Sequence, residues 1–519
     1  MKTYRIGRWV APAFVISLAS TLSCSQEAPP IAVLGTGGTV AAGAGGGGAG
    51  GVASATGGTL TSTGGSSITI GGANLGGAAG DCKGLQCAQT SCKQGACTQK
   101  ACASGQTTVT GIVYDPAGKV PLYNVVVYVP NGPVLPFGTG ASCDRCGQTV
   151  INPVVSALTD TSGKFVLNDV PVGQNVPLVL QIGKWRRQVT IPNVAACVDT
   201  PLSDPQMMRL PRNKAEGDIP LIAITTGGAD SMECLPRRMG LDDAEFTTGA
   251  GEGRIHLFNG SDHVTNGAMD VATKSFDAAL NGGAALLPAT GLWATKEALS
   301  KYDIVILSCE GGTMDADKPM TARQALYDYS SLGGRVFASH WHRVWFSNGP
   351  QPVPTVGTWS DRTEPANPSM GAINTTFPKG QALAQWLVNV GASTTPGEME
   401  IREPRDNIQA VNPALATSWI TVQNTNARQN PETVQYLSFN TPLNVADDQK
   451  CGRVVFTDLH VSTSSADPNV TDTRGVPFPS GCVQRDLSAQ EKAVEFMLFD
   501  LSSCVMNDDT PPKPPEPPR

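Results

Sequence analysis

The stretch TARQALYDYSSLGGRVFASHWH, residues 321–342, decides the fold of the C-terminal half of this 519-residue chain. Its first half places Ala322, Ala325, Leu326 and Tyr329 on one face of a helix, because they recur at helical spacing. Two glycines follow, and the apolar run after them is typical of a buried strand. The stretch therefore predicts one helix–strand unit of an α/β sheet.

The same alternation of strand and helix signals extends over residues 217–505. It predicts a three-layer α/β domain with a mostly parallel sheet and helices on both faces, interrupted by a loop-rich insertion before residue 380. A (β/α)₈ barrel is disfavoured because too few strand–helix units are available. Asp230 follows the first strand and is expected to cap the short helix after it. The other segments that carry these signals are 218–240, 253–260, 294–312, 380–391, 434–440, 452–461 and 487–503.

Three of the five histidines lie at the ends of two apolar runs. His340 and His342 end the run quoted above, and Asp458 and His460 end the run in CGRVVFTDLHVS, residues 451–462. Ligands of open α/β sheets bind just beyond the carboxyl ends of the strands, so we expect these side chains to face a common crevice. The spacing of two also predicts that the members of each pair point to the same side of a strand.

These strand-end side chains are of the types that bind zinc or another divalent metal ion. The candidate metal ligands are His340, His342, Asp458 and His460. A polar cleft for a sugar or another ligand is the second interpretation, in which Glu310 and Trp341 lie beside the same residues. The third interpretation is structural, because many buried side chains hydrogen-bond only to the backbone.

Cys309 ends another apolar run and would be a reactive thiol if a histidine lay beside it. The alternative is a small buried residue without a chemical role. His340 and Cys309 are the catalytic candidates, and Ser339 is a weaker candidate nucleophile. His256 and His263 are expected to lie near loops, exposed to solvent.

Three segments of this region, residues 302–312, 325–342 and 451–462, resemble the class I glutamine-amidotransferase-like superfamily and, within it, the ThuA-like group. The resemblance implies a flavodoxin-like fold, and it gives His340 the place of a histidine that ends the corresponding ThuA-like strand. Amidotransferase relatives carry a nucleophilic cysteine on a sharp elbow flanked by glycines. Residues 338–342 contain neither, so the glutaminase mechanism is not expected to carry over.

Residues 106–212 predict a small β-sandwich, because short runs rich in valine, isoleucine and leucine are separated by turn signals. GIVYDPAGKVPLYNVVVYV (residues 111–129) and TDTSGKFVLNDVPVG (residues 159–173) resemble the signature segments of the carboxypeptidase regulatory-like domain, a prealbumin-like sandwich. The resemblance implies a non-catalytic module for support or adhesion.

Residues 1–24 resemble a bacterial lipoprotein signal peptide, with a basic start, an apolar stretch too short to span a bilayer, and Cys24 at the end. Lipidation of Cys24 and a plain secretory signal cut nearby are both open. Residues 25–81 are dominated by small residues and predict a flexible tether, and residues 506–519 predict an extended, disordered proline-rich tail. The expected location is the bacterial cell envelope, with the membrane as a partner through Cys24.

Cysteine usage agrees with export, because the chain has 14 cysteines and disulfides persist in oxidising compartments. Five of them recur at a step of five within the Cys-rich segment 82–105, where disulfides are favoured over a zinc site. Cys143 and Cys146 form a CxxC that predicts a structural disulfide, with Cys197 involved. The disulfide candidates are Cys82, Cys87, Cys92, Cys97, Cys102, Cys143, Cys146 and Cys197.

Two hypotheses for function follow. The first is a tethered envelope lipoprotein whose ThuA-like domain binds a carbohydrate or another envelope ligand. The second is a metal-dependent hydrolase acting on envelope sugars or amides through the histidine cleft. The net charge of −7 gives no electrostatic reason to expect a nucleic-acid partner.

Overall fold

The structure, a computed structural model, describes residues 91–92, 96–147, 150, 153–265, 268–428, 431–461 and 471–516. The chain divides into two compact units, Met1–Gly76 and Gly77–Arg519, and all described residues belong to the second. The predicted signal peptide and tether lie outside the described residues, as do Cys24, Cys82 and Cys87.

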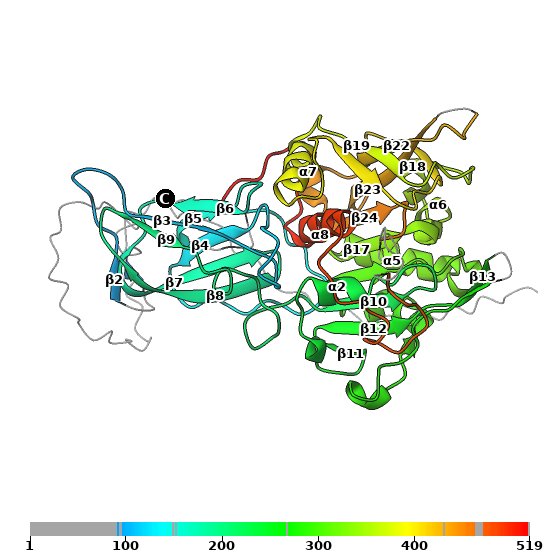
Figure 1. Ribbon diagram of the computed structural model, residues 1–519, viewed down its shortest axis with the longest axis horizontal. Helices are drawn as coiled ribbons and strands as arrows, with labels where there is room; N and C mark the ends of the chain where they lie inside the picture. Colours follow the sequence, from blue (N-terminus) through cyan, green and yellow to red (C-terminus); the bar gives the residue numbers. More distant parts are fainter. Residues whose placement is uncertain are drawn as a thin grey trace, which may run out of the picture. The chain divides into compact units, whose positions relative to one another are not determined.

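The larger sheet has eleven strands in the order β11-β12-β10-β16-β17-β24-β23-β22-β19-β20, with β15 beside β12 (Figure 1). Strands from β11 to β24 run parallel, and those from β23 to β20 run antiparallel. The parallel strands are β10 (Ile222–Thr226), β11 (Phe246–Thr248), β12 (Ile255–Asn259), β15 (Leu287–Pro288), β16 (Ile304–Leu307), β17 (Arg335–Ser339) and β24 (Gly452–Thr457). The antiparallel strands are β19 (Ser369–Ile373), β20 (Glu398–Ile401), β22 (Thr417–Gln423) and β23 (Glu432–Thr441). The predicted α/β domain with a mostly parallel sheet is confirmed.

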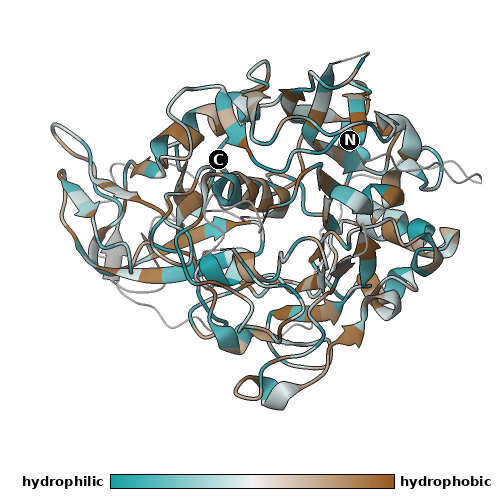
Figure 2. Cartoon of the chain, turned by 45° about the vertical axis from the view of Figure 1, so that its right-hand side comes forward, coloured by the Kyte–Doolittle hydropathy of each residue, from teal (hydrophilic) through white to brown (hydrophobic). Residues whose placement is uncertain are grey.

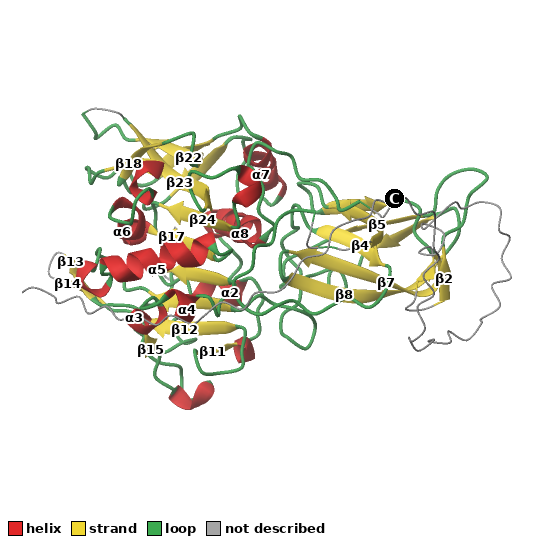
Figure 3. Cartoon of the chain, turned by 180° about the vertical axis from the view of Figure 1, so that it is seen from behind, coloured by secondary structure: helices red, strands yellow, loops and turns green. Residues whose placement is uncertain are grey.

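Helices cover both faces of this sheet, as predicted (Figure 3). The helices α2 (Cys234–Arg238), α7 (Pro378–Asn389) and α8 (Ala489–Ser502) pack on one face. The other face carries α3 (Ala289–Leu292), α4 (Lys296–Leu299), α5 (Met320–Ser331) and α6 (Val344–Ser347). Alternate residues of a strand point to opposite faces, so Ile304 and Ile306 join one core while Val305 and Leu307 join the other. Apolar residues recur along the covered strands (Figure 2).

The α5–β17 unit forms where the sequence predicts it. The four apolar residues of the predicted helical face are all buried in α5. Gly333 between the two elements has a φ of 120°, and a Cβ there would lie 2.2 Å from the carbonyl oxygen of Ser142. A Cβ on Gly334 would lie 2.3 Å from the ring of Tyr329. Both glycines are therefore required by space, and Gly333 also by its backbone conformation.

The predicted cap of α2 is wrong. The residue before this helix is Glu233, which makes no side-chain cap. Asp230 instead accepts hydrogen bonds from Ser339 Oγ at 3.2 Å and from the backbone N–H of Val461 at 3.0 Å. Its side chain ties the ends of three strands together rather than starting a helix.

The predicted β-sandwich is confirmed. Its larger sheet has the order β1-β2-β7-β4-β5 with β8 beside β7, and its smaller sheet has the order β6-β3-β9. The strands are β1 (Ser91–Cys92), β2 (Ala96–Thr98), β3 (Thr108–Ile112), β4 (Val126–Pro130), β5 (Pro153–Leu158), β6 (Lys164–Leu167), β7 (Val172–Ile182), β8 (Trp185–Val194) and β9 (Asp199–Leu202). Val109, Val127 and Leu178 are fully buried between them.

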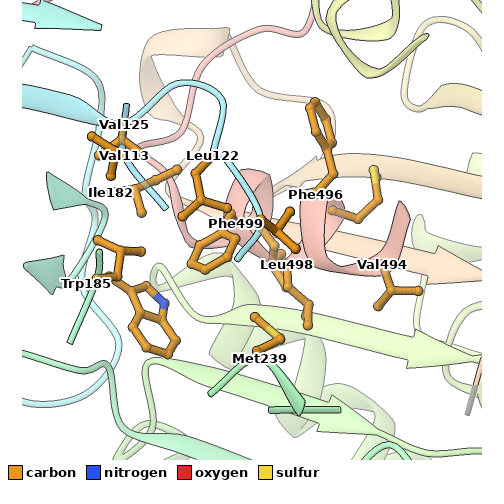
Figure 4. Packing of buried hydrophobic residues seen from close by; sticks show 14 of the residues in the cluster. Val113, Leu122, Val125, Ile182, Trp185, Met239, Val494, Phe496, Leu498 and Phe499 are labelled. Atoms are coloured by element: carbon orange, nitrogen blue, oxygen red, sulfur yellow. The ribbon is translucent and has the colours of Figure 1, made fainter. Parts of the chain in front are cut away.

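Helix α8 connects the sandwich with the α/β sheet. Figure 4 shows Phe499 of this helix among Leu122, Ile182 and Trp185 of the sandwich. Phe496 stacks on Tyr123 of the sandwich, with ring centroids 5.7 Å apart. The Trp185 and Phe499 ring centroids are 5.7 Å apart. The two folded regions therefore share one apolar core.

The disulfides depart from the predicted pairing. Cys143 bonds to Cys451 and Cys146 bonds to Cys504, so the CxxC links the sandwich to the α/β region. The predicted involvement of Cys197 with this motif is wrong, because Cys197 pairs with Cys102 inside the sandwich. A fourth disulfide joins Cys234 to Cys482. In the β1–β2 hairpin, Cys92 and Cys97 lie opposite each other.

The predicted disorder of the tail is wrong for residues 506–516. Asp508 is 6% exposed and accepts from the Arg453 guanidinium at 2.8 Å. Further along, the Pro515 carbonyl accepts a hydrogen bond from Ser156 Oγ. A charged anchor and a sandwich contact thus hold a proline-rich segment that cannot form a core of its own.

Candidate functional site

Three side chains meet at the carboxyl ends of the adjacent parallel strands β16, β17 and β24. Cys309 Sγ is 3.4 Å from His340 Nδ1, and His340 Nδ1 is 3.1 Å from His460 Nε2. All three potential ligand atoms lie within 4.8 Å of one another. The residues are 0%, 3% and 7% exposed, respectively. We call this group the Cys–His–His cluster.

His342 lies outside the cluster. The prediction that it shares a strand face with His340 is wrong, because β17 ends at Ser339 and residues 340–343 form a 3-10 turn. Its Nε2 donates to the carbonyl oxygen of Ser308 at 2.7 Å, and its Nδ1 accepts from Trp345 Nε1 at 2.8 Å. Both ring nitrogens are engaged, so His342 has no lone pair left for a metal ion.

Asp458 also lies outside the cluster, because β24 ends at Thr457 and the pairwise strand geometry predicted for Asp458 and His460 does not form. Its Oδ2 accepts from the backbone N–H of Asn407 at 2.7 Å. Burial raises the pKa of Asp458 well above its usual value, and the charges of Glu364 and Asp406 raise it further.

Glu310 forms a buried ion pair on the side of His342. Its Oε2 is 2.5 Å from Lys318 Nζ, and both side chains are 1% exposed. Its Oε1 accepts from the backbone N–H of Ser261 at 2.9 Å. Trp341 is half-buried, and its ring centroid is 4.8 Å from that of His340. Of these two predicted ligand-binding residues, only Trp341 borders the cluster.

Two left-handed residues flank His460. His340 has a φ of 42° and Glu403 a φ of 51°, conformations that non-glycine residues rarely adopt and that cluster at functional sites. A left-handed residue between a strand and a helical turn is also the arrangement of a nucleophile elbow. The sharp turn therefore forms without flanking glycines, and a histidine takes the elbow position.

Glu403 and Arg405 complete the site, although the sequence patterns predict neither residue. His460 Nδ1 is 2.8 Å from Glu403 Oε2 and 3.1 Å from Arg405 Nη2. The loop that carries them is fixed by buried amides. Gln435 Nε2 donates to the Arg405 carbonyl at 2.8 Å, and Gln490 Oε1 accepts from the backbone N–H of Arg402 at 3.0 Å.

The two cluster histidines have opposite pKa shifts. Burial holds the pKa of His340 well below its usual value, and the positive charges of His460, Arg405 and Arg343 lower it further. Burial would also lower the pKa of His460, but Cys309 and Glu403 outweigh it and raise the pKa to about 9. Without a bound metal ion, His340 is thus a neutral ring and His460 a charged one held between a thiol and a carboxylate.

The remaining predicted residues are structural. Ser339 is fully buried and donates to Asp230, so it is not placed as a nucleophile. The prediction that His256 is exposed is wrong, since it is 6% exposed and its Nδ1 is 3.0 Å from Tyr302 Oη. His263 is half-buried.

No protein-family model matches the chain, and no curated protein matches it by sequence. Among similar solved structures, a ThuA-like protein from Bacteroides uniformis is 11% identical over 48% of this chain and 84% of its own, with a TM-score of 0.24. A protein assigned as a GMP synthase subunit from Thermoplasma acidophilum is 9% identical over 47% of this chain and 84% of its own, with a TM-score of 0.25. A cohesin–X-dockerin complex from Acetivibrio cellulolyticus gives 17% identity over 28% of this chain and 79% of that chain, with a TM-score of 0.14. TM-scores this low carry no argument about function, and the carboxypeptidase regulatory-like resemblance stays a prediction.

The disulfides indicate a protein that folds outside the cytoplasm, because such bonds are rare in reducing compartments. Within the described residues, no helix is both long enough and apolar enough to cross a membrane.

Proposed function

We propose that the Cys–His–His cluster binds a divalent transition-metal ion of the zinc type and that the protein is a metal-dependent hydrolase. The observation that carries the proposal is the approach of three ligand atoms from three strand ends to within 4.8 Å of one another. With metal–sulfur bonds of about 2.3 Å and metal–nitrogen bonds of about 2.0 Å, tetrahedral ligand atoms lie about 3.3–3.6 Å apart. The spacings of 3.4 and 3.1 Å are close to that range.

The chemistry of the donor set supports the same class of metal. Thiolate and imidazole ligands suit zinc and copper, whereas calcium and magnesium prefer oxygen. Glu403 stands behind His460, and a carboxylate behind a ligating imidazole fixes the tautomer and orientation of the ring. Burial favours the neutral form of His340, the form that offers a lone pair to a metal.

Three protein ligands suit a catalytic role, because a tetrahedral metal then keeps one position for water or substrate. A bound zinc ion lowers the pKa of its water to about 7 and polarises a carbonyl group. The chain itself contributes the orientation of His460 through Glu403 and a positive charge at Arg405. Buried amides fix the backbone beside the site, since Gln435 donates to the Arg405 carbonyl and Gln490 to the His460 carbonyl, which favours one fixed geometry.

Metal analysis of the purified full-length protein tests this proposal. We expect about one equivalent of zinc per chain. Cys309→Ser or His460→Gln should lower this zinc content at least about tenfold. His256→Gln is the matched control, because His256 is also buried but lies outside the cluster. Wild-type protein that stays metal-free after incubation with zinc and dialysis would contradict the proposal. A visible thiolate-to-copper absorption band after copper loading, with no hydrolysis under zinc, would point to electron transfer instead.

A thiol hydrolase is the second candidate, and the position of His460 between Cys309 and Glu403 favours it. A thiol, an imidazole and an orienting carboxylate are the parts of a cysteine nucleophile activated by a base. The two candidates separate in one experiment. Activity that survives chelation but is lost on alkylation of Cys309 supports the thiol mechanism, whereas activity that is lost on chelation and restored by added zinc supports the metal.

We also propose an envelope location with a lipid anchor at Cys24 and a sandwich module that supports the α/β domain. The signal-like start of the sequence supports this part, and the disulfides agree with export. Binding of a carbohydrate or another envelope ligand belongs to the same proposal. Membrane fractionation of wild-type and Cys24→Ser protein tests the anchor, and release of the variant from membranes is the expected outcome.

A further inference from the structure

Three buried N–H donors next to the Cys–His–His cluster have no hydrogen-bond acceptor. They are Arg343 Nε, Arg405 Nε and His340 Nε2. When Nδ1 of His340 faces the cluster as a ligand or acceptor, the proton of the neutral ring lies on Nε2. Buried donors are almost always satisfied in folded proteins, so three in one place call for a ligand.

Each guanidinium group lies near one of the two cluster histidines or its neighbour. Arg405 Nη2 is 3.1 Å from His460 Nδ1. The Arg343 guanidinium is 5.2 Å from the centre of the Trp341 ring, and that ring is 4.8 Å from the ring of His340.

Each guanidinium is already oriented by its other nitrogens. Arg343 is 9% exposed, and its Nη2 donates to Asp361 at 2.8 Å. Arg405 donates through Nη2 to Glu403 at 3.1 Å. Their Nε groups are thus held in place with a free proton each, which is the preorganisation that a binding site needs.

Two buried oxygens nearby also lack partners. They are Asp458 Oδ1 and Asn407 Oδ1. A chain of hydrogen bonds connects them with Arg343, since Asn407 N donates to Asp458 and Asn407 Nδ2 donates to Asp361 at 2.8 Å. A ligand at this place therefore meets both unpaired donors and unpaired acceptors.

We infer that these groups form a subsite for an oxyanion, a carboxylate or a phosphate, carried by an amide substrate. Arginine suits planar or tetrahedral oxyanions because its N–H groups match their oxygens. Asn407 Oδ1 would accept from the amide N–H or a hydroxyl of the same molecule. That this molecule is the substrate rests on the proposed function, whereas the oxyanion binding itself does not.

Titration calorimetry on the full-length protein tests the subsite with three probes: N-acetylalanine, its uncharged analogue N-acetylalaninamide, and inorganic phosphate. We expect an anionic probe to bind and the uncharged amide to bind at least about tenfold more weakly. Binding of N-acetylalanine alone would identify a carboxylate subsite, and binding of inorganic phosphate alone would identify a phosphate subsite. Equal binding of N-acetylalanine and its amide, or no binding of either anion, would overturn the inference.

Variants locate the binding. Arg343→Gln and Arg405→Gln should each lower the affinity for the anion by about 10- to 100-fold. Arg343→Lys keeps the charge without the Nε donor and should also lower the affinity for the anion. It serves as the test if the glutamine variant folds poorly. Arg402→Gln is the control, since Arg402 lies on the same loop and pairs with Glu400. Unchanged affinity in the Arg343 and Arg405 variants would overturn the assignment. If wild-type protein binds the anion but takes up no metal, and Arg343→Gln loses the anion, the subsite would be supported and the proposed function contradicted.

Discussion

His340 and His342 are two residues apart on one turn, both are buried, and they belong to opposite kinds of polar cluster. Around His342, both ring nitrogens are bonded and Glu310 is paired with Lys318. Around His340, one ring nitrogen has no partner and the backbone is left-handed. A buried polar cluster with every atom satisfied stabilises a fold, while one with strain and unpaired atoms indicates a site for chemistry.

Removal of Lys318 should break the satisfied cluster and give the largest effect. Lys318→Met leaves Glu310 buried without its partner, so we expect a loss of about 3–5 kcal/mol in the free energy of unfolding. Denaturant unfolding measures it. Lys296→Met is the control, because its pair with Glu297 is 3.9 Å long and exposed, and it should cost less than about 0.5 kcal/mol. A loss in Lys318→Met no larger than in this control would contradict the role of the ion pair.

Substitution of each histidine in turn should separate the effect on stability from the effect on metal binding. His342→Ala removes two buried hydrogen bonds and leaves a cavity, so it should cost about 2–4 kcal/mol and keep the metal. His340→Gly suits a φ of 42°, and the strain that it relieves partly offsets the cavity that it leaves, so it should cost less than His342→Ala, about 1–3 kcal/mol, while the metal is lost. Thermal unfolding and metal content, measured on the same samples, check both. If His342→Ala is folded and has also lost the metal, the predicted difference between the two histidines would be contradicted.

Glu403 should tune the site without supporting the fold. Glu403→Gln should lower zinc affinity by about 10- to 100-fold, because the orienting carboxylate behind His460 is lost. Competition with a chromogenic chelator measures the affinity. Glu400→Gln, a half-exposed position next to the same loop, should leave it unchanged.

The smallest expected effect is a pH dependence at the interface of the sandwich and α8. Burial raises the pKa of Asp115 from 3.8 to about 6, and both carboxylate oxygens of Glu495 on α8 are buried without partners. A carboxyl group with a raised pKa binds more protons in the folded state, so its contribution is complete below pH 4 and is lost as the pH rises through 6. We expect unfolding free energy to fall by about 1–2 kcal/mol over that window, and Asp115→Asn to flatten the fall. A rise in stability over the same window would contradict the shift.

The sequence predicts the elements whose residues are buried on all sides. β16, β17 and β24 are continuous apolar runs, and their order in the sheet brings Cys309, His340 and His460 together. Among the antiparallel strands, the apolar run of β23 was predicted, whereas β19 and β20 were missed because they bury only alternate residues and lie among polar segments. Strand signals thus depend on two-sided burial.

Glu403 and Arg405 could not be predicted as part of the site, because they lie 57 and 55 residues away from His460 along the chain. Gln435 and Gln490 hold the loop of Glu403 through Arg405 and Arg402, and no local pattern encodes those contacts. The signal that was available was the charged run at residues 402–406 inside an irregular segment. Cysteine partners were equally inaccessible, since spacing alone does not fix connectivity.

The two bonds from the CxxC have a practical consequence. Cys143–Cys451 and Cys146–Cys504 span 308 and 358 residues, so almost the whole α/β region lies inside covalent rings. A protease that cuts once between residues 147 and 450 would leave both fragments attached until a reductant is added. Nicked molecules would run as intact protein on a non-reducing gel, a useful tolerance for a protein that folds outside the cytoplasm.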